Sequence, residues 1–109
     1  MYISVTGLKT KNLYASMKFW LLTIPAFSAA QKADGILLCE NNSRNGYQHT
    51  LTVWETKTHM LAYVRSPEYM KAMRAFPSIA SGRLLSYESD FIPTWDEALL
   101  KWEREARDG

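Results

Sequence analysis

An Asn-Gly pair between two strand-like runs constrains the fold of this chain more than any other feature. Asn45 and Gly46 lie between a first β-run, Ile36–Glu40, and a second one, Tyr47–Trp54. Asparagine and glycine tolerate the positive φ angles of a tight hairpin turn, so the pair is a strong hairpin signal. We therefore expect an antiparallel hairpin whose polar turn covers Asn42–Gly46.

The segment before the hairpin contains one predicted strand and one predicted helix. Residues Tyr2–Leu8 alternate and include β-branched side chains, which is typical of a strand. From Leu13 to Ala33 apolar residues recur at helical spacing, with Asn12 as N-cap, and we expect Pro25 to kink or break this helix. The residues on its broad apolar face are Leu13, Met17, Trp20, Leu21, Ile24, Phe27 and Ala30.

Two further helices are predicted directly after the hairpin. Thr56 can cap a helix that runs to about Val64. Ser66 and Pro67 then begin the second helix, because proline is tolerated at the first helical position. We expect Pro77 to end it.

The last part of the chain adds a strand and a C-terminal helix. Gly82–Glu88 is the predicted strand, and Thr94 with Glu97 is the signature of a capping box. With the two consecutive helices counted as one, the order is β, α, β, β, α, β, α, which is the ferredoxin-like or split βαβ arrangement with an added helix. The prediction is one α+β domain over residues 1–109, with a four-stranded antiparallel sheet and helices on one face.

Both faces of this sheet carry apolar side chains. Along the second hairpin strand, alternation places Tyr47, His49, Leu51 and Val53 on one face and Gln48, Thr50, Thr52 and Trp54 on the other. The helices of this arrangement cover only one face. We therefore expect a second copy of the chain to cover the other face, in a homodimer.

Charge and cysteine content exclude several classes of partner and location. The formal net charge is only +2, which argues against nucleic acid or an acidic membrane as partner. The longest apolar run, Phe19–Phe27, is shorter than a membrane span and contains Pro25. Cys39 is the single cysteine, so no internal disulfide can form, and no basic, apolar leader opens the chain. We expect a cytoplasmic protein.

Few residues are candidates for catalysis. His49 and His59 have no metal-ligand spacing, so no metal site is predicted. Cys39 could be a nucleophile only with a base such as His49 beside it across the hairpin, and a small buried hydrophobic residue is the favoured alternative. His49 is the best candidate for a catalytic base or polar anchor.

The chain has more aromatic rings than one small core accommodates easily: four Trp, six Tyr and four Phe. Any one of them is a core residue by default, but together with methionine they can wall a cavity for an apolar small molecule. The predicted cavity residues are Trp20, Phe27, Thr50, Thr52, Trp54, Met60, Tyr63, Arg65, Met73, Phe76 and Tyr87.

Two segments resemble a known superfamily. Thr50–Glu55, followed by a helix and then by Arg65–Met73, resembles the strand, W-E, helix, S-P-x-[FY] pattern of the antibiotic biosynthesis monooxygenase-like dimeric α/β-barrel superfamily. Met1–Lys9, Phe19–Pro25 and Gln31–Ala33 look like small bacterial proteins of unknown function that are similar to spheroidene monooxygenase. The resemblance covers most of the chain.

The resemblance implies two ferredoxin-like protomers with sheets packed face to face, and a ligand cavity between sheet and helices. Some members oxygenate polycyclic aromatic compounds without metal or flavin, others bind or degrade haem or isomerise small molecules, and many have no known activity. Haem-degrading members carry a histidine on the helix after the S-P element, whereas Tyr69–Phe76 has none. No cofactor is predicted, and haem stays open.

Two hypotheses for function stay open. The first is a monooxygenase-like enzyme that acts on an apolar, aromatic or isoprenoid-like molecule. The second is a non-catalytic dimeric ligand-binding or structural protein with the same cavity. An RNA-recognition module has the same element order, but its third strand carries a basic-Gly-aromatic motif that Gln48–Trp54 lacks.

Overall fold

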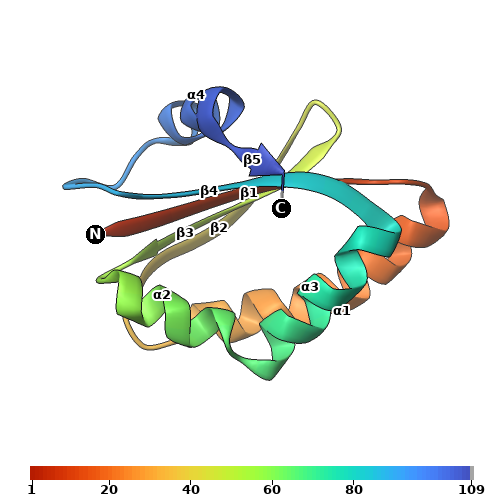
Figure 1. The fold of residues 1–109 in the computed structure, drawn as a ribbon, viewed down its shortest axis with the longest axis horizontal. Coiled ribbons are helices and arrows are strands. Elements are labelled where there is room, and N and C mark those ends of the chain that lie inside the picture. The colour runs from red at the N-terminus through yellow and green to blue at the C-terminus, as the bar shows by residue number, and fades with distance from the viewer. Residues whose placement is uncertain (109) are drawn as a thin grey trace.

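A computed structural model describes residues 1–108 of the chain and contains five strands and four helices within that range. The predicted order of elements is confirmed, with one short strand added at the end (Figure 1). The elements are β1 (Tyr2–Thr10), α1 (Leu13–Gln31), β2 (Ile36–Arg44), β3 (Tyr47–Trp54), α2 (Lys57–Val64), α3 (Pro67–Ile79), β4 (Ala80–Glu88), α4 (Trp95–Glu105) and β5 (Arg107–Asp108).

The sheet has the strand order β2-β3-β1-β4-β5, and each neighbouring pair is antiparallel. Its first four strands form the predicted ferredoxin-like sheet. The hairpin between β2 and β3 is confirmed, and its turn has the positive φ angles expected of this pair, 54° at Asn45 and 81° at Gly46. The predicted polar turn was too long, because β2 continues to Arg44, which pairs with Tyr47.

Helices lie on both sides of the sheet (Figure 1). α1, α2 and α3 lie on one face, as predicted, whereas α4 packs on the opposite face. There α4 closes a core over the central strands, so the chain's own helix covers part of the face for which a second copy was expected. This core is formed by Ile3, Val5, Leu51, Val53, Ala98, Leu99 and Trp102.

A glycine in β1 allows α4 to approach the sheet closely. A Cβ atom at Gly7 would lie 2.2 Å from Cζ2 of Trp102 and 2.8 Å from Cε1 of His49. The indole of Trp102 therefore occupies space that any other residue at this position would fill. Its Nε1 donates a hydrogen bond to the carbonyl oxygen of Arg83 at 3.0 Å, which fixes α4 to β4.

Helix α1 differs from its prediction in two ways. It is capped by Asn12 as expected, but it continues through Pro25 without a break. Most of the predicted apolar face points to solvent, and the side that packs inward contains Ala15, Phe19, Ala26 and Ala30. α3 likewise continues past Pro77 to Ile79, because a proline near a helix end removes one hydrogen bond while the packing of Ile79 remains.

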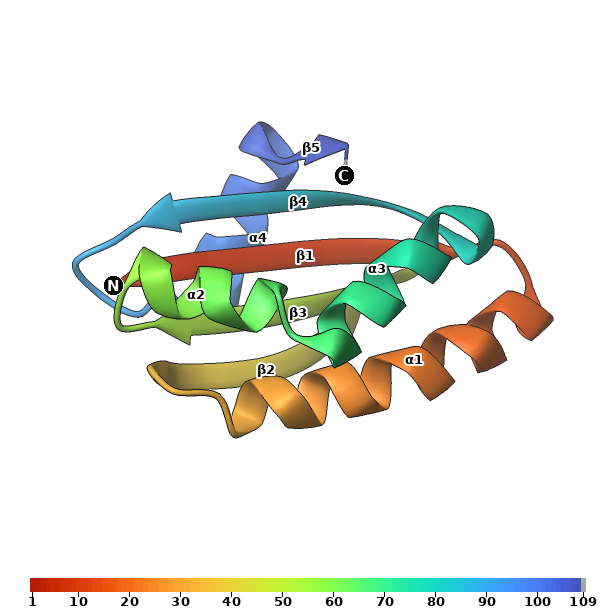
Figure 2. The same ribbon diagram turned by 60° about the horizontal axis from the view of Figure 1, so that its bottom comes forward.

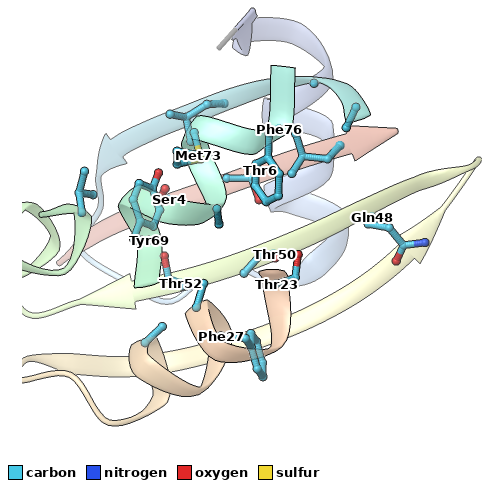
Figure 3. A pocket seen from close by; sticks show the side chains of 18 of the residues that line it. Ser4, Thr6, Thr23, Phe27, Gln48, Thr50, Thr52, Tyr69, Met73 and Phe76 are labelled. Carbon is cyan, nitrogen blue, oxygen red and sulfur yellow. The ribbon is translucent and has the colours of Figure 1, made fainter. Parts of the chain in front are cut away.

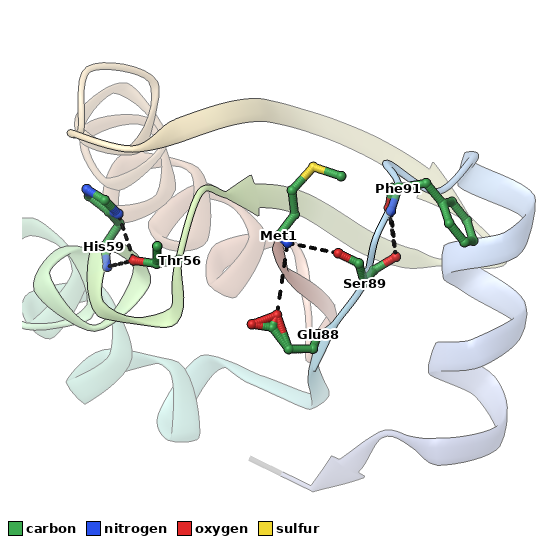
Figure 4. A network of polar contacts seen from close by, with 6 residues as sticks. All are labelled: Met1, Thr56, His59, Glu88, Ser89 and Phe91. Atoms are coloured by element: carbon green, nitrogen blue, oxygen red, sulfur yellow. Dashed lines mark hydrogen bonds and ion pairs between the residues drawn. The ribbon is translucent and has the colours of Figure 1, made fainter.

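Polar contacts fix the N-terminus and the start of α2 (Figure 4). The ammonium group of Met1 donates to the carbonyl oxygen of Ser89 at 2.8 Å. Thr56 caps α2 as predicted, and its Oγ1 lies 2.8 Å from Nδ1 of His59. His59 therefore has a local structural contact. Across residues 1–108, none of the helices is long and apolar enough to cross a membrane.

Candidate functional site

A cavity of about 460 Å³ lies between the sheet and the helices α1, α2 and α3. Its floor is a set of hydroxyl groups from β1 and β3 (Figure 3). Strand register explains the set, since Ser4 pairs with Thr52 and Thr6 pairs with Thr50, and paired residues of antiparallel strands point to the same face. The floor of the cavity therefore presents four hydroxyl groups, and none of these four residues is charged.

The walls of the cavity are mainly apolar (Figure 3). α1 contributes Thr23 and Phe27, and α3 contributes Tyr69, Met73 and Phe76. Much of the predicted cavity set is therefore brought together. The predicted residues that line the cavity are Phe27, Thr50, Thr52, Trp54, Met60, Tyr63, Met73 and Phe76.

Three predicted cavity residues lie elsewhere. Trp20 is 41% exposed on the outer side of α1. Arg65 is exposed at the C-cap of α2. Tyr87 pairs with Ile3, so it lies on the α4 face of the sheet, where the ammonium of Lys101 is 4.9 Å from its ring centre. These three residues are close in sequence to residues that line the cavity, but their side chains lie on other sides of their helices or strand.

His49 lies on the α4 face of β3 and not in the cavity. It is 4% exposed, its ring centre is 4.7 Å from that of Trp102, and its Nδ1 is 3.1 Å from the carbonyl oxygen of Thr6. Burial lowers the pKa of its imidazole, which favours the neutral form. The sheet separates His49 from any ligand in the cavity, so the structure does not bring this predicted base to the site.

Cys39 is also separated from His49. Cys39 pairs with Thr52 and His49 pairs with Asn42, and these pairs lie on opposite faces of the sheet. Burial, followed by the charge of Glu40, raises the pKa of the Cys39 thiol to about 11. A thiol with that pKa is protonated at neutral pH, and the cysteine and histidine that sequence analysis considered as a pair do not meet.

The end of β3 contains the most unusual group in the cavity wall. Trp54 is completely buried, and its Nε1 finds no hydrogen-bond acceptor among the described residues. The ring of Tyr63 stacks on it at 5.3 Å, and the Tyr63 hydroxyl donates to the carbonyl oxygen of Ala26 at 2.8 Å. Oγ1 of Thr23 on α1 is also buried and has no hydrogen-bond partner within residues 1–108.

Sequence analysis missed several cavity residues that a simple signal could have identified. The first strand alternates between Ile3 and Val5, which pack under α4, and Ser4 and Thr6, which face the cavity. The same period of two therefore predicts two hydroxyl groups on the side of β1 that faces α1, α2 and α3. Thr23 has no comparable signal. The missed residues include Ser4, Thr6, Thr23, Gln48 and Tyr69.

The cavity offers little acid-base or metal chemistry. Its lining residues include no Asp, Glu, His, Lys or Cys, and the guanidinium of Arg83 lies 4.4 Å from the ring centre of Trp102, on the other face. Within residues 1–108, no three His, Cys, Asp or Glu side chains gather closely enough to hold a metal ion. Toward haem iron, the lining offers the thioethers of Met60 and Met73 and the hydroxyls of Tyr63 and Tyr69, and no imidazole.

Comparison with known proteins identifies the fold. No protein-family model matches the chain, and no curated protein sequence does. A proposed antibiotic biosynthesis monooxygenase from Deinococcus radiodurans superimposes with a TM-score of 0.72 over 86% of this chain and 97% of its own, at 21% identity.

Two further solved structures give the same result. A proposed antibiotic biosynthesis monooxygenase from Nitrosomonas europaea has a TM-score of 0.73 over 84% of this chain and 100% of its own, at 10% identity. SnoaB, a cofactor-independent oxygenase from Streptomyces nogalater, has a TM-score of 0.68 over 84% of this chain and 94% of its own, at 8% identity. The resemblance inferred from sequence motifs is therefore confirmed at the level of the fold.

Proposed function

Because the chain has the fold of the antibiotic biosynthesis monooxygenases, we propose that its cavity binds an apolar small molecule and oxygenates it with O₂ and without a cofactor. The observation that carries the proposal is the Nε1 of Trp54, a buried hydrogen-bond donor in the cavity wall that has no acceptor among the described residues. Such a donor costs free energy unless a partner satisfies it. Nε1 is covered in the ligand-free protein, so we propose that ligand binding turns the indole and lets Nε1 donate to an oxygen atom of the ligand.

The lining residues indicate the class of ligand. Phe27, Met73 and Phe76 suit a hydrocarbon or aromatic skeleton, and the hydroxyls of the floor suit one or two oxygen substituents. The volume of about 460 Å³ falls in the range of sites for drug-sized ligands. A phenolic aromatic molecule meets all of these requirements, and an isoprenoid-like molecule with a terminal oxygen meets most of them.

In the proposed reaction the ionised substrate itself reacts with O₂. Since none of the described lining residues has a side chain that acts as a general base, the phenol must lose its proton to solvent as it binds. The Trp54 N–H, once it faces the ligand, stabilises the resulting phenolate oxygen. The phenolate then supplies electrons to O₂. For a naphthol, one oxygen atom joins the ring and the other leaves as water with two substrate hydrogens, so naphthol and O₂ give naphthoquinone and water. Solvent returns one proton when water forms.

A variant that fills the cavity tests this function. Ala72 on α3 is 2% exposed and lines the cavity. We expect the wild-type protein to bind a naphthol in native mass spectrometry and to consume O₂ with it. In Ala72→Phe, or the milder Ala72→Leu, binding should fall by at least about tenfold because the added side chain occupies ligand space.

Ala62→Phe is the matched control, because Ala62 is exposed on α2. It should bind the naphthol as the wild-type protein does, and circular dichroism will show that all variants are folded. If Ala72→Phe is folded and still binds and turns over the naphthol like Ala62→Phe, the cavity is not the site.

A non-catalytic ligand-binding protein is the second candidate function. The absence of acid-base groups from the cavity lining favours it, because binding needs no proton transfer. The same experiment separates the two functions. Naphthol binding that is lost in Ala72→Phe, without O₂ consumption by the wild-type protein, identifies a binding protein.

We also propose a homodimer that packs through the α4 side of the sheet. Leu85 and Tyr87 on β4 are only partly buried there, and Leu100 on α4 is 50% exposed. A second copy would cover these side chains. Light scattering should give twice the chain mass of 12.5 kDa, and Leu100→Glu should lower that mass. A monomeric wild-type protein would contradict the proposed dimer.

A further inference from the structure

Helix α1 exposes an unusual amount of apolar surface, and it forms the outer edge of the helix layer (Figure 2). Leu13, Leu21 and Ile24 are 79%, 75% and 62% exposed. Tyr14, Met17 and Trp20 are 74%, 61% and 41% exposed. These six residues are called the α1 stripe below.

The α1 stripe is continuous because its members recur at helical spacing. Leu13, Met17, Leu21 and Ile24 are separated by four, four and three residues, so they lie one above the other on a single side. The opposite side of α1 is buried through Phe19 and its neighbours. Exposed apolar patches of this kind mark a surface that binds another protein or a membrane.

The charge around the α1 stripe indicates which of these partners binds it. The first 33 residues contain four lysines and no Asp or Glu, and the first acidic residue is Asp34. Lys11 precedes α1, Lys18 lies within it and Lys32 is its C-cap, and all three are exposed. A second copy packed on the same stripe would bring these lysines together, whereas anionic lipid headgroups would neutralise them.

The aromatic members of the stripe favour the same partner. Tyr14 and Trp20 combine a large apolar ring with a polar atom, which suits the interface between lipid headgroups and acyl chains. Apolar side chains, interfacial aromatic rings and lysines are the three components of helices that lie in the plane of a membrane.

We propose that the α1 stripe docks the protein onto the surface of a bilayer that contains anionic lipids. Sequence analysis predicted no membrane partner from the short apolar run and the net charge of +2. Surface docking requires no spanning helix, and the lysines act locally around α1. The inference does not depend on the proposed activity, since its test uses no substrate.

Sedimentation with lipid vesicles tests the docking surface. The full-length protein should sediment with vesicles of phosphatidylcholine and phosphatidylserine, and less with phosphatidylcholine alone. The double variant Leu21→Ser, Ile24→Ser should bind at least about tenfold more weakly because two inserted apolar side chains are lost. Lys18→Gln should bind about fivefold more weakly to the anionic vesicles.

Phe91→Ser is the matched control, because Phe91 is 59% exposed in the loop that leads to α4 on the other side of the sheet. It should bind vesicles like the wild-type protein. Trp20 should also shift its fluorescence to shorter wavelength with vesicles, and Trp20→Phe should abolish that shift.

Three results would overturn the inference. The first is absence of vesicle binding by the wild-type protein. The second is binding that the stripe variants and Phe91→Ser change equally. The third is a wild-type dimer that Leu21→Ser converts to a monomer in light scattering, which would assign the α1 stripe to a second copy of the chain.

Discussion

Replacement of Trp102 by alanine will lower the free energy of unfolding by about 3–5 kcal/mol, the usual cost of deleting a large buried aromatic side chain. Trp102 is 3% exposed and packs against Tyr47 and His49, with ring centres 5.4 and 4.7 Å from its own. The variant also loses the Nε1 hydrogen bond to the carbonyl oxygen of Arg83. Equilibrium unfolding in urea measures the change.

Trp20→Ala is the control for this prediction. It removes the same side chain from the outer side of α1, where 41% of Trp20 is exposed, so it should cost much less. Equal losses in the two variants would mean that α4 does not close a core on this face. The comparison therefore tests whether the chain covers the centre of this sheet face with its own helix.

Replacement of Trp54 by phenylalanine will lower kcat/KM for the proposed oxygenation by about 100-fold, which is typical of losing one donor to a developing oxyanion. Phenylalanine keeps a smaller aromatic ring against Tyr63 and removes the Nε1 donor, which has no acceptor among the described residues. The smaller ring also leaves a void at a completely buried position, so the free energy of unfolding should fall by about 1 kcal/mol. O₂ consumption with a naphthol and urea unfolding measure the two effects.

Trp95→Phe provides the matched control, because Nε1 of Trp95 donates to Glu40 at 2.9 Å on the α4 side of the sheet. It should retain wild-type kcat/KM. His49→Gln should do so as well, since the sheet separates His49 from the cavity. A loss in Trp54→Phe no greater than in Trp95→Phe would remove Trp54 from the proposed mechanism.

Some features of the site could have been predicted from the sequence more fully. Alternation along β3 places His49 on the face opposite Thr50 and Thr52, so a cavity lined by these threonines could not include His49. The same alternation in β1 separates Ser4 and Thr6 from Ile3 and Val5. These conclusions need only the period of a strand.

Prolines were weaker signals than expected. Pro25 and Pro77 each remove one backbone donor, and sequence analysis predicted a kink or break at the first and a helix end at the second. Both helices continue, because Ala26 and Ala30 beyond Pro25 and Ile79 beyond Pro77 are buried in the protein. Tertiary packing of the following turn outweighs the loss of one hydrogen bond.

The sequence by itself determined the local elements and their order. The caps Asn12, Ser66 and Thr94 and the turn Asn45-Gly46 act through contacts a few residues apart, so their effect is readable from the chain alone. The side on which an element packs depends on remote residues. Only the tertiary structure decided that α4 covers the centre of the second sheet face, that the α1 stripe points outward and that Trp54 finds no acceptor in the described part of the chain.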